Sequence, residues 1–297
     1  MPFPTAAPPS DCRHRCAGRG AAVEHSAHQE DHVDSDTPEL LVTVEPPLAW
    51  LIVNRPAARN ALTLAVWRGL AEHVQRLGGR SDVRVLILRG AGSEAFIAGA
   101  DITEFPTLRS NAAATAAYDE QTAATLAAIR GLDKPVIAMI NGLCFGGGCS
   151  VALACDLRLA ADHARFAIPA VRLGLAYPFA AGLDTLVHLV GPGAAADMLL
   201  SGRPLDAAEA LRIGLVNRVE AGEQLESVTR DYALRLADCA PLTIAAHKTA
   251  IHESLRPVSE RDHARLAALS ARCFNSADYQ EGVAAFLAKR KPVFTGK

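Results

Sequence analysis

The spacing of hydrophobic residues changes in a regular order along most of the chain. Short, nearly continuous apolar runs predict buried strands at 83–90, 134–142 and 156–161. Between them, apolar residues recur at helical spacing over 63–77 and 112–129. This alternation of strands and helices predicts an α/β fold with parallel strands and short crossovers.

The two ends of the chain differ from this middle part. Residues 1–37 are rich in proline, alanine, histidine and charge and lack apolar periodicity, so they are predicted to form a disordered extension. Residues 38–200 are predicted to form the α/β core. Because strand signals fade after about Ala194, residues 201–297 are predicted to form a helical C-terminal region. Its later helices are expected at 223–237, 241–255, 261–273 and 278–289.

Charge and composition exclude several classes of protein. A net charge of -2 indicates that the chain lacks the excess of basic residues typical of nucleic-acid-binding proteins. No apolar run is long enough for a membrane span, and no signal-peptide core is present. We therefore expect a cytoplasmic protein without nucleic-acid or membrane partners.

The cysteines predict neither disulfides nor a metal site. There are 7 of them, without a framework of spacings, which indicates reduced thiols. Cys12 and Cys16 precede His25, His28 and His32, but this spacing matches zinc sites poorly. Cys144, Cys149 and Cys155 fall on apolar segments and are interpreted as small buried hydrophobic side chains. No bound metal is expected.

Two glycine-bearing turns follow predicted strands. One reads "AFIAGADITEF" (95–105) and the other "NGLCFGGGCSVALACD" (141–156). Backbone N–H groups at a helix start are free, and two that converge on one oxygen would form an oxyanion hole. Neither turn has the spacing of a P-loop, a dinucleotide fingerprint or a nucleophile elbow. Either turn alone could be an ordinary tight connection, whereas their joint occurrence favours a functional interpretation.

In these segments the chain resembles the crotonase family, which has the enoyl-CoA hydratase/isomerase fold. The resemblance covers roughly 38–297 and rests on five motifs in order: "NRPAARNAL", "AFIAGADI", "KPVIAMINGLCFGGGCSVALACDLRLA", "LSGRPLDAAEALRIGLVNRV" and "EGVAAFLAKRKPVF". It implies a spiral of repeated β-β-α turns with a C-terminal helical trimerisation region. It also implies a homotrimer or a hexamer made of two trimers. The implied ligand is an acyl-CoA thioester, with coenzyme A as part of the substrate and no separate cofactor.

The resemblance also assigns roles to particular residues. The backbone N–H groups of Ala100 and Gly147 would form the oxyanion hole. Losing one such donor typically slows a reaction by ~10²–10³. Coenzyme A would lie near Arg59, Ala61, Ala98, Ile102 and Lys289. Lys289, or Lys291 in its place, would be supplied by the C-terminal helix across a subunit boundary. The basic members of this set could equally be ordinary solvated charges.

The sequence departs from the family at both catalytic glutamates. Family hydratases use two carboxylates to activate water and exchange a proton. At the matching positions this chain has Ser150 and Ala170. A hydroxyl without a partner is a poor base, and alanine has no proton chemistry.

Several nearby polar residues could replace the glutamates. Tyr177 is the first candidate, because it lies close in sequence to Ala170; the alternative is a packing aromatic in a turn. Glu104 is a second acid/base candidate, and Asp119 could flank the mouth of an acyl pocket; the alternative for both is a surface charge.

Two hypotheses about function follow from these residues. The first is an acyl-CoA enzyme that stabilises a thioester enolate and handles protons with atypical residues. Isomerisation, relocated hydration, decarboxylation and thioester cleavage all remain open. The second is a non-catalytic acyl-CoA-binding homologue, for which the two missing carboxylates are the evidence.

Overall fold

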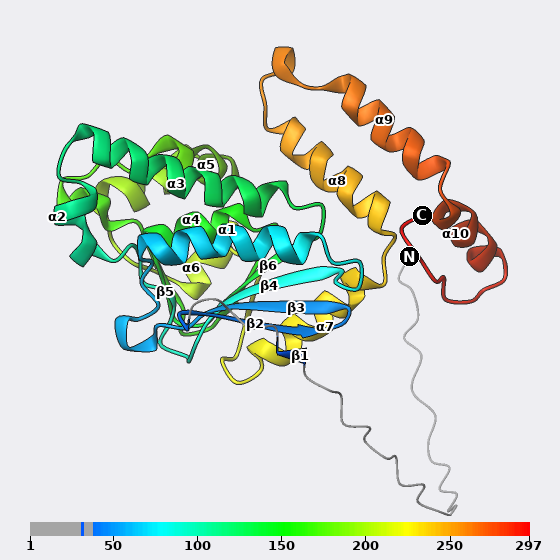
Figure 1. The fold of residues 1–297 in the computed structure, drawn as a ribbon, viewed down its shortest axis with the longest axis horizontal. Helices are drawn as coiled ribbons and strands as arrows, with labels where there is room; N and C mark the ends of the chain where they lie inside the picture. Colours follow the sequence, from blue (N-terminus) through cyan, green and yellow to red (C-terminus); the bar gives the residue numbers. More distant parts are fainter. Residues whose placement is uncertain (1–30, 33–37) are drawn as a thin grey trace, which may run out of the picture.

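The computed structural model describes residues 31–32 and 38–297, and its core consists of two β-sheets with helices packed around them (Figure 1). The larger sheet has 7 strands in the order β1-β2-β3-β4-β6-β8-β11, and the smaller has 4 in the order β10-β9-β7-β5. The strands are β1 Asp31–His32, β2 Leu40–Glu45, β3 Leu48–Val53, β4 Val85–Gly90, β5 Ala95–Ile97, β6 Val136–Ile140, β7 Leu143–Phe145, β8 Leu157–Ala161, β9 Arg165–Ala167, β10 Leu205–Asp206 and β11 Arg218–Glu220.

Helices follow the strands of each turn of the fold. The α-helices are α1 Leu64–Gly78, α2 Phe105–Leu108, α3 Ala112–Gly131, α4 Gly147–Ala154, α5 Leu183–Ser201, α6 Ala207–Arg212, α7 Leu225–Ala237, α8 Pro241–Ser254, α9 His263–Phe274 and α10 Ala277–Leu287. Short 3-10 helices are η1 Pro56–Ala58, η2 Ile102–Glu104, η3 Pro169–Leu173, η4 Phe179–Ala181 and η5 Val258–Glu260. Thr63 is the N-cap of α1, because its Oγ1 accepts a hydrogen bond from Val66 N at 3.2 Å.

The predicted spiral of β-β-α turns is confirmed by the order of pairing. Each turn places one strand in the larger sheet and the next in the smaller, and then continues into a helix. The pairs β4–β6, β6–β8 and β8–β11 are parallel in the larger sheet, as are β5–β7 and β7–β9 in the smaller one. Parallel neighbours are expected here because every crossover includes a helix.

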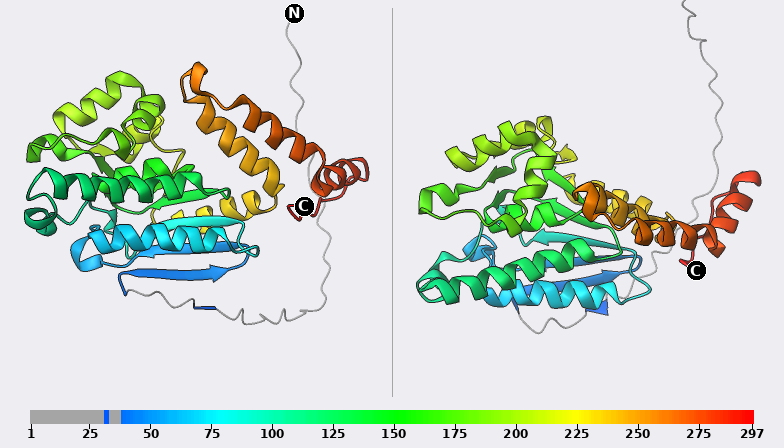
Figure 2. Two further views of the ribbon diagram at one scale, coloured as in Figure 1. Left: turned by 45° about the horizontal axis from the view of Figure 1, so that its top comes forward. Right: turned by 90° about the horizontal axis from the view of Figure 1, so that it is seen from above.

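Central strands of the larger sheet, such as β4 and β6, are buried on both faces, which explains their continuous apolar sequence. On one face, residues such as Leu86 and Leu88 belong to the main core with helices α1, α3 and α4. On the other face, Val85 and Ile87 pack in a second cluster that includes Leu225 of α7. Figure 2 shows these helix layers on either side of the sheet.

The core extends beyond the predicted boundary at residue 200. Strand β11 pairs in parallel with β8, and β10 pairs with β9, so both sheets are completed by residues after 200. These strands have only two or three residues, which is too short for a hydrophobic period to reveal. The helical region that projects from the core is therefore α8–α10 (Figure 1).

The N-terminal stretch also differs in one place from the expectation. Asp31 and His32 pair antiparallel with Val44 and Thr43 of β2, within the segment expected to be disordered. The remainder of residues 1–37, including Cys12, Cys16, His25 and His28, lies outside the described residues.

Helices α8–α10 lie at the opposite end of the molecule from α2 (Figure 1). These helices also carry exposed apolar side chains. Phe286 is 83% exposed, Leu287 76% and Phe274 62%. Polar contacts connect this module to the core: Lys248 Nζ of α8 lies 2.8 Å from Asp156 Oδ2 and donates to Lys134 O at 3.1 Å, and Arg84 Nη2 donates to Phe294 O at 2.7 Å. None of the helices in the described part of the chain is long and apolar enough to cross a membrane.

Candidate active site

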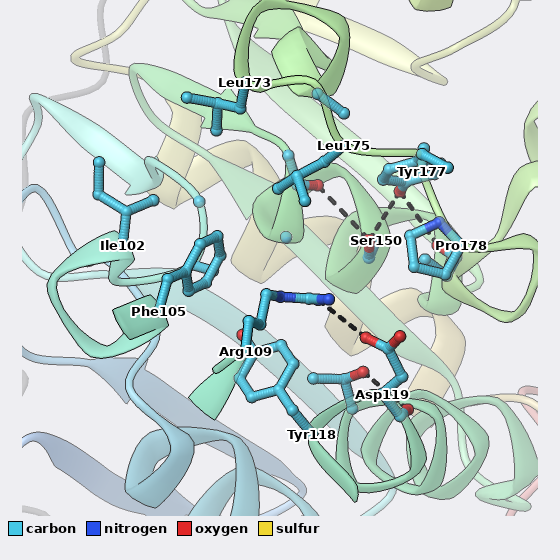
Figure 3. A pocket seen from close by; sticks show the side chains of 18 of the residues that line it. Ile102, Phe105, Arg109, Tyr118, Asp119, Ser150, Leu173, Leu175, Tyr177 and Pro178 are labelled. Atoms are coloured by element: carbon cyan, nitrogen blue, oxygen red, sulfur yellow. Dashed lines mark hydrogen bonds and ion pairs between the residues drawn. The ribbon is translucent and has the colours of Figure 1, made fainter. Parts of the chain in front are cut away.

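A cavity of about 180 Å³ lies beside the two glycine turns, between the N-terminal end of α4 and helix α3 (Figure 3). Its walls come from the 95–105 turn, α2, α3, the start of α4 and the segment 169–181. Apolar side chains cover most of the wall, including Trp67, Phe105 and Leu175. Such a pocket suits an acyl chain, because apolar walls exclude water and a few polar groups can orient the ligand.

Ala100 and Gly147 lie together on the wall of this cavity. A Cβ atom built on Gly147 would be 3.4 Å from Ala100 N, so the two backbones nearly touch. Gly147 is the first residue of α4, where an N–H has no partner within the helix. Among the described residues, none accepts a hydrogen bond from the N–H of Ala100 or of Gly147. The two groups predicted from the family resemblance are therefore adjacent and available.

Glycine is needed at this helix start for steric reasons. Gly146 adopts φ 48°, in the region that favours glycine. A Cβ on Gly148 would be 2.2 Å from the carbonyl oxygen of Ile97, which leaves no room for a side chain. The three glycines thus let α4 begin directly against β5.

The turn that carries Ala100 is held by charged and polar groups. Asp101 pairs with Arg55 at 2.9 Å, and Arg55 also pairs with Glu39 at 2.8 Å. Hydrogen bonds from Thr103, together with Arg55, lower the pKa of Asp101 despite its partial burial. Asp101 N donates to Leu62 O at 2.8 Å, and Leu62 N donates to Gly99 O at 2.9 Å. These bonds on both sides fix the peptide of Ala100.

Ser150 and Tyr177 form one hydrogen-bonded pair on the cavity wall (Figure 3). Ser150 Oγ lies 2.6 Å from Tyr177 Oη, and Tyr177 Oη donates to Ala181 O at 3.1 Å. Either hydroxyl can be the donor in this pair, because Ser150 Oγ also lies 3.5 Å from an acceptor of its own, Gly146 O. The sequence suggested each residue separately, and their contact across 27 positions is a finding of the tertiary structure.

The environment of Tyr177 keeps its phenol neutral. Burial of the phenolic oxygen raises the pKa of Tyr177 well above its usual value, and the hydrogen bond with Ser150 offsets only part of this effect. Tyr177 can therefore donate a hydrogen bond or a proton at neutral pH, but it is a poor base. Ala170 also lines the cavity, next to this pair, without a polar group.

Glu104 is not on the wall of this cavity. Its carboxylate accepts a hydrogen bond from Leu64 N at 2.8 Å, at the start of α1. A carboxylate at a helix N-terminus stabilises the helix by offsetting its dipole and free N–H groups. Glu104 therefore has a structural contact at the start of α1, and it is not among the residues that line the cavity.

Arg109 and Asp119 are the charged residues among those that line the cavity. Arg109 Nη2 lies 2.8 Å from Asp119 Oδ1. From the sequence, Asp119 is expected only as a flanking charge, and Arg109 is not among the predicted site residues. The spacing of ten positions between Arg109 and Asp119 does not predict their contact, because Arg109 lies at the end of α2 and Asp119 lies in α3.

The residues expected near coenzyme A are distributed over two regions. Ala98 and Ile102 line the cavity, and Ile102 is 57% exposed at its mouth. Arg59 accepts a hydrogen bond at its carbonyl from Ala98 N at 3.0 Å, and Ala61 follows it in the same turn. Lys289 follows α10, which lies at the far end of the same chain from α2 (Figure 1).

The three cysteines near α4 are buried, as expected. Cys144 is fully buried, and Cys149 and Cys155 are 3% and 4% exposed. Burial raises the pKa of Cys144 well above its usual value and that of Cys155 to about 12, so both are unreactive thiols. Within the described residues, no group of histidine, cysteine and carboxylate side chains could hold a metal ion.

Comparisons with known proteins agree with this fold and cavity. The profile of the family described as enoyl-CoA hydratase/isomerase matches residues 46–297. The chain belongs to this family of acyl-CoA enzymes. It is 36% identical over 258 residues to the crotonyl-CoA hydratase of Syntrophomonas wolfei, covering 87% of this chain and 98% of that protein. It is 33% identical over 252 residues to the short-chain-enoyl-CoA hydratase of Clostridium acetobutylicum, covering 85% and 95%.

A solved structure from the same family has the same fold. It is an enoyl-CoA hydratase/carnithine racemase from Magnetospirillum magneticum, with 40% sequence identity and a TM-score of 0.83. The similarity covers 88% of this chain and 97% of that one. The spiral core and the projecting helices together account for this coverage.

Proposed function

We propose that this protein binds an acyl-CoA thioester with its carbonyl oxygen between the N–H groups of Ala100 and Gly147. The observation that carries the proposal is the adjacency of these two unpartnered donors on an apolar cavity wall. Negative charge that develops on the oxygen as an enolate forms would be stabilised there, because the donors are already oriented and water is excluded.

We further propose that the Ser150–Tyr177 pair replaces the usual two carboxylates. Because Tyr177 stays protonated, it suits a donor role toward the enolate carbon or toward a reacting oxygen. A reaction that forms the enolate without a base fits this site best. Decarboxylation is such a reaction, since the C–C bond electrons enter the thioester and carbon dioxide leaves. Isomerisation, relocated hydration and thioester cleavage would need a further base.

The alternative function is acyl-CoA binding without catalysis. The absence of a carboxylate at Ser150 and at Ala170 supports it. The cavity and the donor pair would then serve affinity alone.

Turnover and binding measured in parallel test these proposals. We would assay malonyl-, methylmalonyl- and crotonyl-CoA, and measure butyryl-CoA binding by calorimetry. The enzymatic proposal expects turnover that falls ~10²–10⁴-fold in Tyr177→Phe, with butyryl-CoA binding retained. Tyr232→Phe is the matched control, because Tyr232 packs against the second core cluster away from the cavity. Binding without turnover of any substrate would support the non-catalytic alternative, and no binding would contradict both.

We also propose that helices α8–α10 assemble the chain into a homotrimer, alone or paired as a hexamer. Their exposed aromatic and aliphatic side chains support this, because a monomer rarely exposes so many on one module. In such an assembly Lys289 would reach the coenzyme A of a neighbouring protomer, since it follows α10, which lies at the opposite end of one chain from α2.

A further inference from the structure

Arg109 lies on the cavity wall with most of its hydrogen-bonding capacity unused. A guanidinium has five N–H donors. One bond is formed, from Nη2 to Asp119 Oδ1 at 2.8 Å. Arg109 Nε is buried and has no hydrogen-bond partner in the described part of the chain.

The guanidinium is held in place before any ligand arrives. Its central carbon lies 5.1 Å from the ring centre of Phe105 and 4.8 Å from that of Tyr118. The two rings meet edge to face at 6.1 Å, and Trp67 Nε1 donates to Tyr118 Oη at 3.2 Å. Figure 3 shows the side chain crossing the cavity above Tyr118, with its end directed toward Asp119. Aromatic contacts of this kind orient the cation without using its N–H groups.

An unpaired, buried donor on a charged group is costly to leave unsatisfied. Arg109 Nε is already enclosed by protein atoms, so the donors left for a ligand are the N–H groups at the end of the guanidinium that Asp119 does not use. A purely alkyl acyl chain would remove water from these N–H groups and give them no acceptor, whereas an acyl chain with an oxygen at this position would accept their hydrogen bonds. Sites built to hydrogen-bond a substrate reject analogues that lack the group more strongly than they reject small changes in size.

Resting on the function proposed above, we propose that Arg109 selects acyl groups that carry an oxygen acceptor beyond the thioester, as a carboxylate or a hydroxyl. Asp119 limits how strongly Arg109 selects such acyl groups. Its carboxylate is 35% exposed and already neutralises Arg109, so it repels a ligand carboxylate weakly and can accept a bond from a ligand hydroxyl. The acyl end is the partner, because Arg109, Tyr118 and Asp119 line the same cavity as the two oxyanion donors.

Binding of saturated, unreactive thioesters tests the proposal independently of turnover. The probes are butyryl-, succinyl- and 4-hydroxybutyryl-CoA, with free coenzyme A as reference, measured by calorimetry. We expect one or both oxygen-bearing thioesters to bind ~10–100-fold more tightly than butyryl-CoA. In Arg109→Met the preference should disappear, while free coenzyme A binds as before. Arg68→Met is the matched control, because it removes an exposed arginine of α1 that does not line the cavity.

A second variant keeps the test independent of the folding of Arg109→Met. Asp119→Asn frees Arg109 and removes the like charge, so the preference for succinyl-CoA over butyryl-CoA should increase. The proposal is overturned if the wild-type protein binds butyryl-CoA as tightly as both oxygen-bearing thioesters. It is also overturned if Arg109→Met weakens free coenzyme A equally, or if Asp119→Asn abolishes the preference. Failure of the wild-type protein to bind any CoA thioester would instead contradict the proposed function.

Discussion

At the scale of single residues, the proposed function depends on atoms that carry no side-chain chemistry. Ala100 and Gly147 would act through their backbone N–H groups, so their roles depend on backbone position alone. Ser150 and Tyr177 add a neutral hydroxyl pair beside them. The family motifs predicted the two donors, whereas the hydroxyl pair and the arginine required the fold.

Gly147→Ala should separate folding from function. The added Cβ would lie 3.2 Å from Trp67 Cζ2 and 3.4 Å from Ala100 N, within the space where the thioester oxygen is expected. We expect turnover to fall ~10²–10³-fold, as for the loss of one oxyanion donor, with thermal unfolding nearly unchanged. Gly131→Ala is the matched control, because a Cβ there has nothing within 4 Å. Unchanged turnover in Gly147→Ala would contradict the assigned hole.

Tyr177 should make folding stability fall at alkaline pH. A tyrosine in the unfolded chain ionises near pH 10, whereas burial raises the pKa of Tyr177 in the folded protein. Below pH ~10 both states keep the proton, and the contribution is fully present. Above it the unfolded state loses the proton first, so the free energy of unfolding falls by up to about 1.4 kcal/mol per pH unit. Urea unfolding between pH 9 and 11 should show a steeper loss in the wild type than in Tyr177→Phe, and equal slopes would contradict this.

At the scale of elements, the turn before α1 connects the first strands to the cavity. Asn60 is fully buried at φ 58°. Its Nδ2 donates to Ala95 O at 2.7 Å and to Ala91 O at 3.0 Å, and its Oδ1 accepts from Arg55 N at 3.0 Å. One side chain therefore joins the turn to both ends of the loop between β4 and β5.

Asn60→Ala should destabilise the protein strongly. It removes three hydrogen bonds, leaves buried backbone groups unpaired and strains a left-handed residue, so we expect a loss of about 2–4 kcal/mol in the free energy of unfolding. Asn111→Ala is a matched control, because Asn111 forms one capping bond to Ala114 N at the exposed start of α3. That loss should be about 1 kcal/mol. Chemical denaturation would compare the two, and similar losses would refute the assignment.

At the scale of the whole molecule, helices α8–α10 carry several exposed apolar side chains, among them Phe274, Phe286 and Leu287. If these helices pair between protomers, Phe286→Glu should dissociate the assembly, because Phe286 is 83% exposed in one chain and a charge would be buried at the contact. Light scattering would give the mass of each species. Leu41→Glu, on the exposed face of β2, should leave the mass unchanged. A wild-type monomer would contradict the proposed trimer.

The hydrophobic pattern was sufficient for most elements of the core. Strands such as β4 and β6 are buried on both faces, so their continuous apolar runs are distinct from the helical spacing of α1 and α3. Strands β10 and β11 were missed because two or three residues carry no period and their pairing partners, β9 and β8, are distant in sequence. For this reason the core extends beyond residue 200, where the sequence predicted its boundary.

The sequence by itself determined the family and the α/β spiral, and it predicted the two donor positions and the loss of both carboxylates. These follow from local patterns and ordered motifs, which require no knowledge of contacts. Only the tertiary structure decided that Ser150 meets Tyr177, that Glu104 caps α1 and that Arg109 lines the cavity, held by Asp119 and two aromatic rings. Each depends on which distant backbone lies within hydrogen-bond reach, and that is fixed by the packing of α3, α4 and the 169–181 segment rather than by neighbours in sequence.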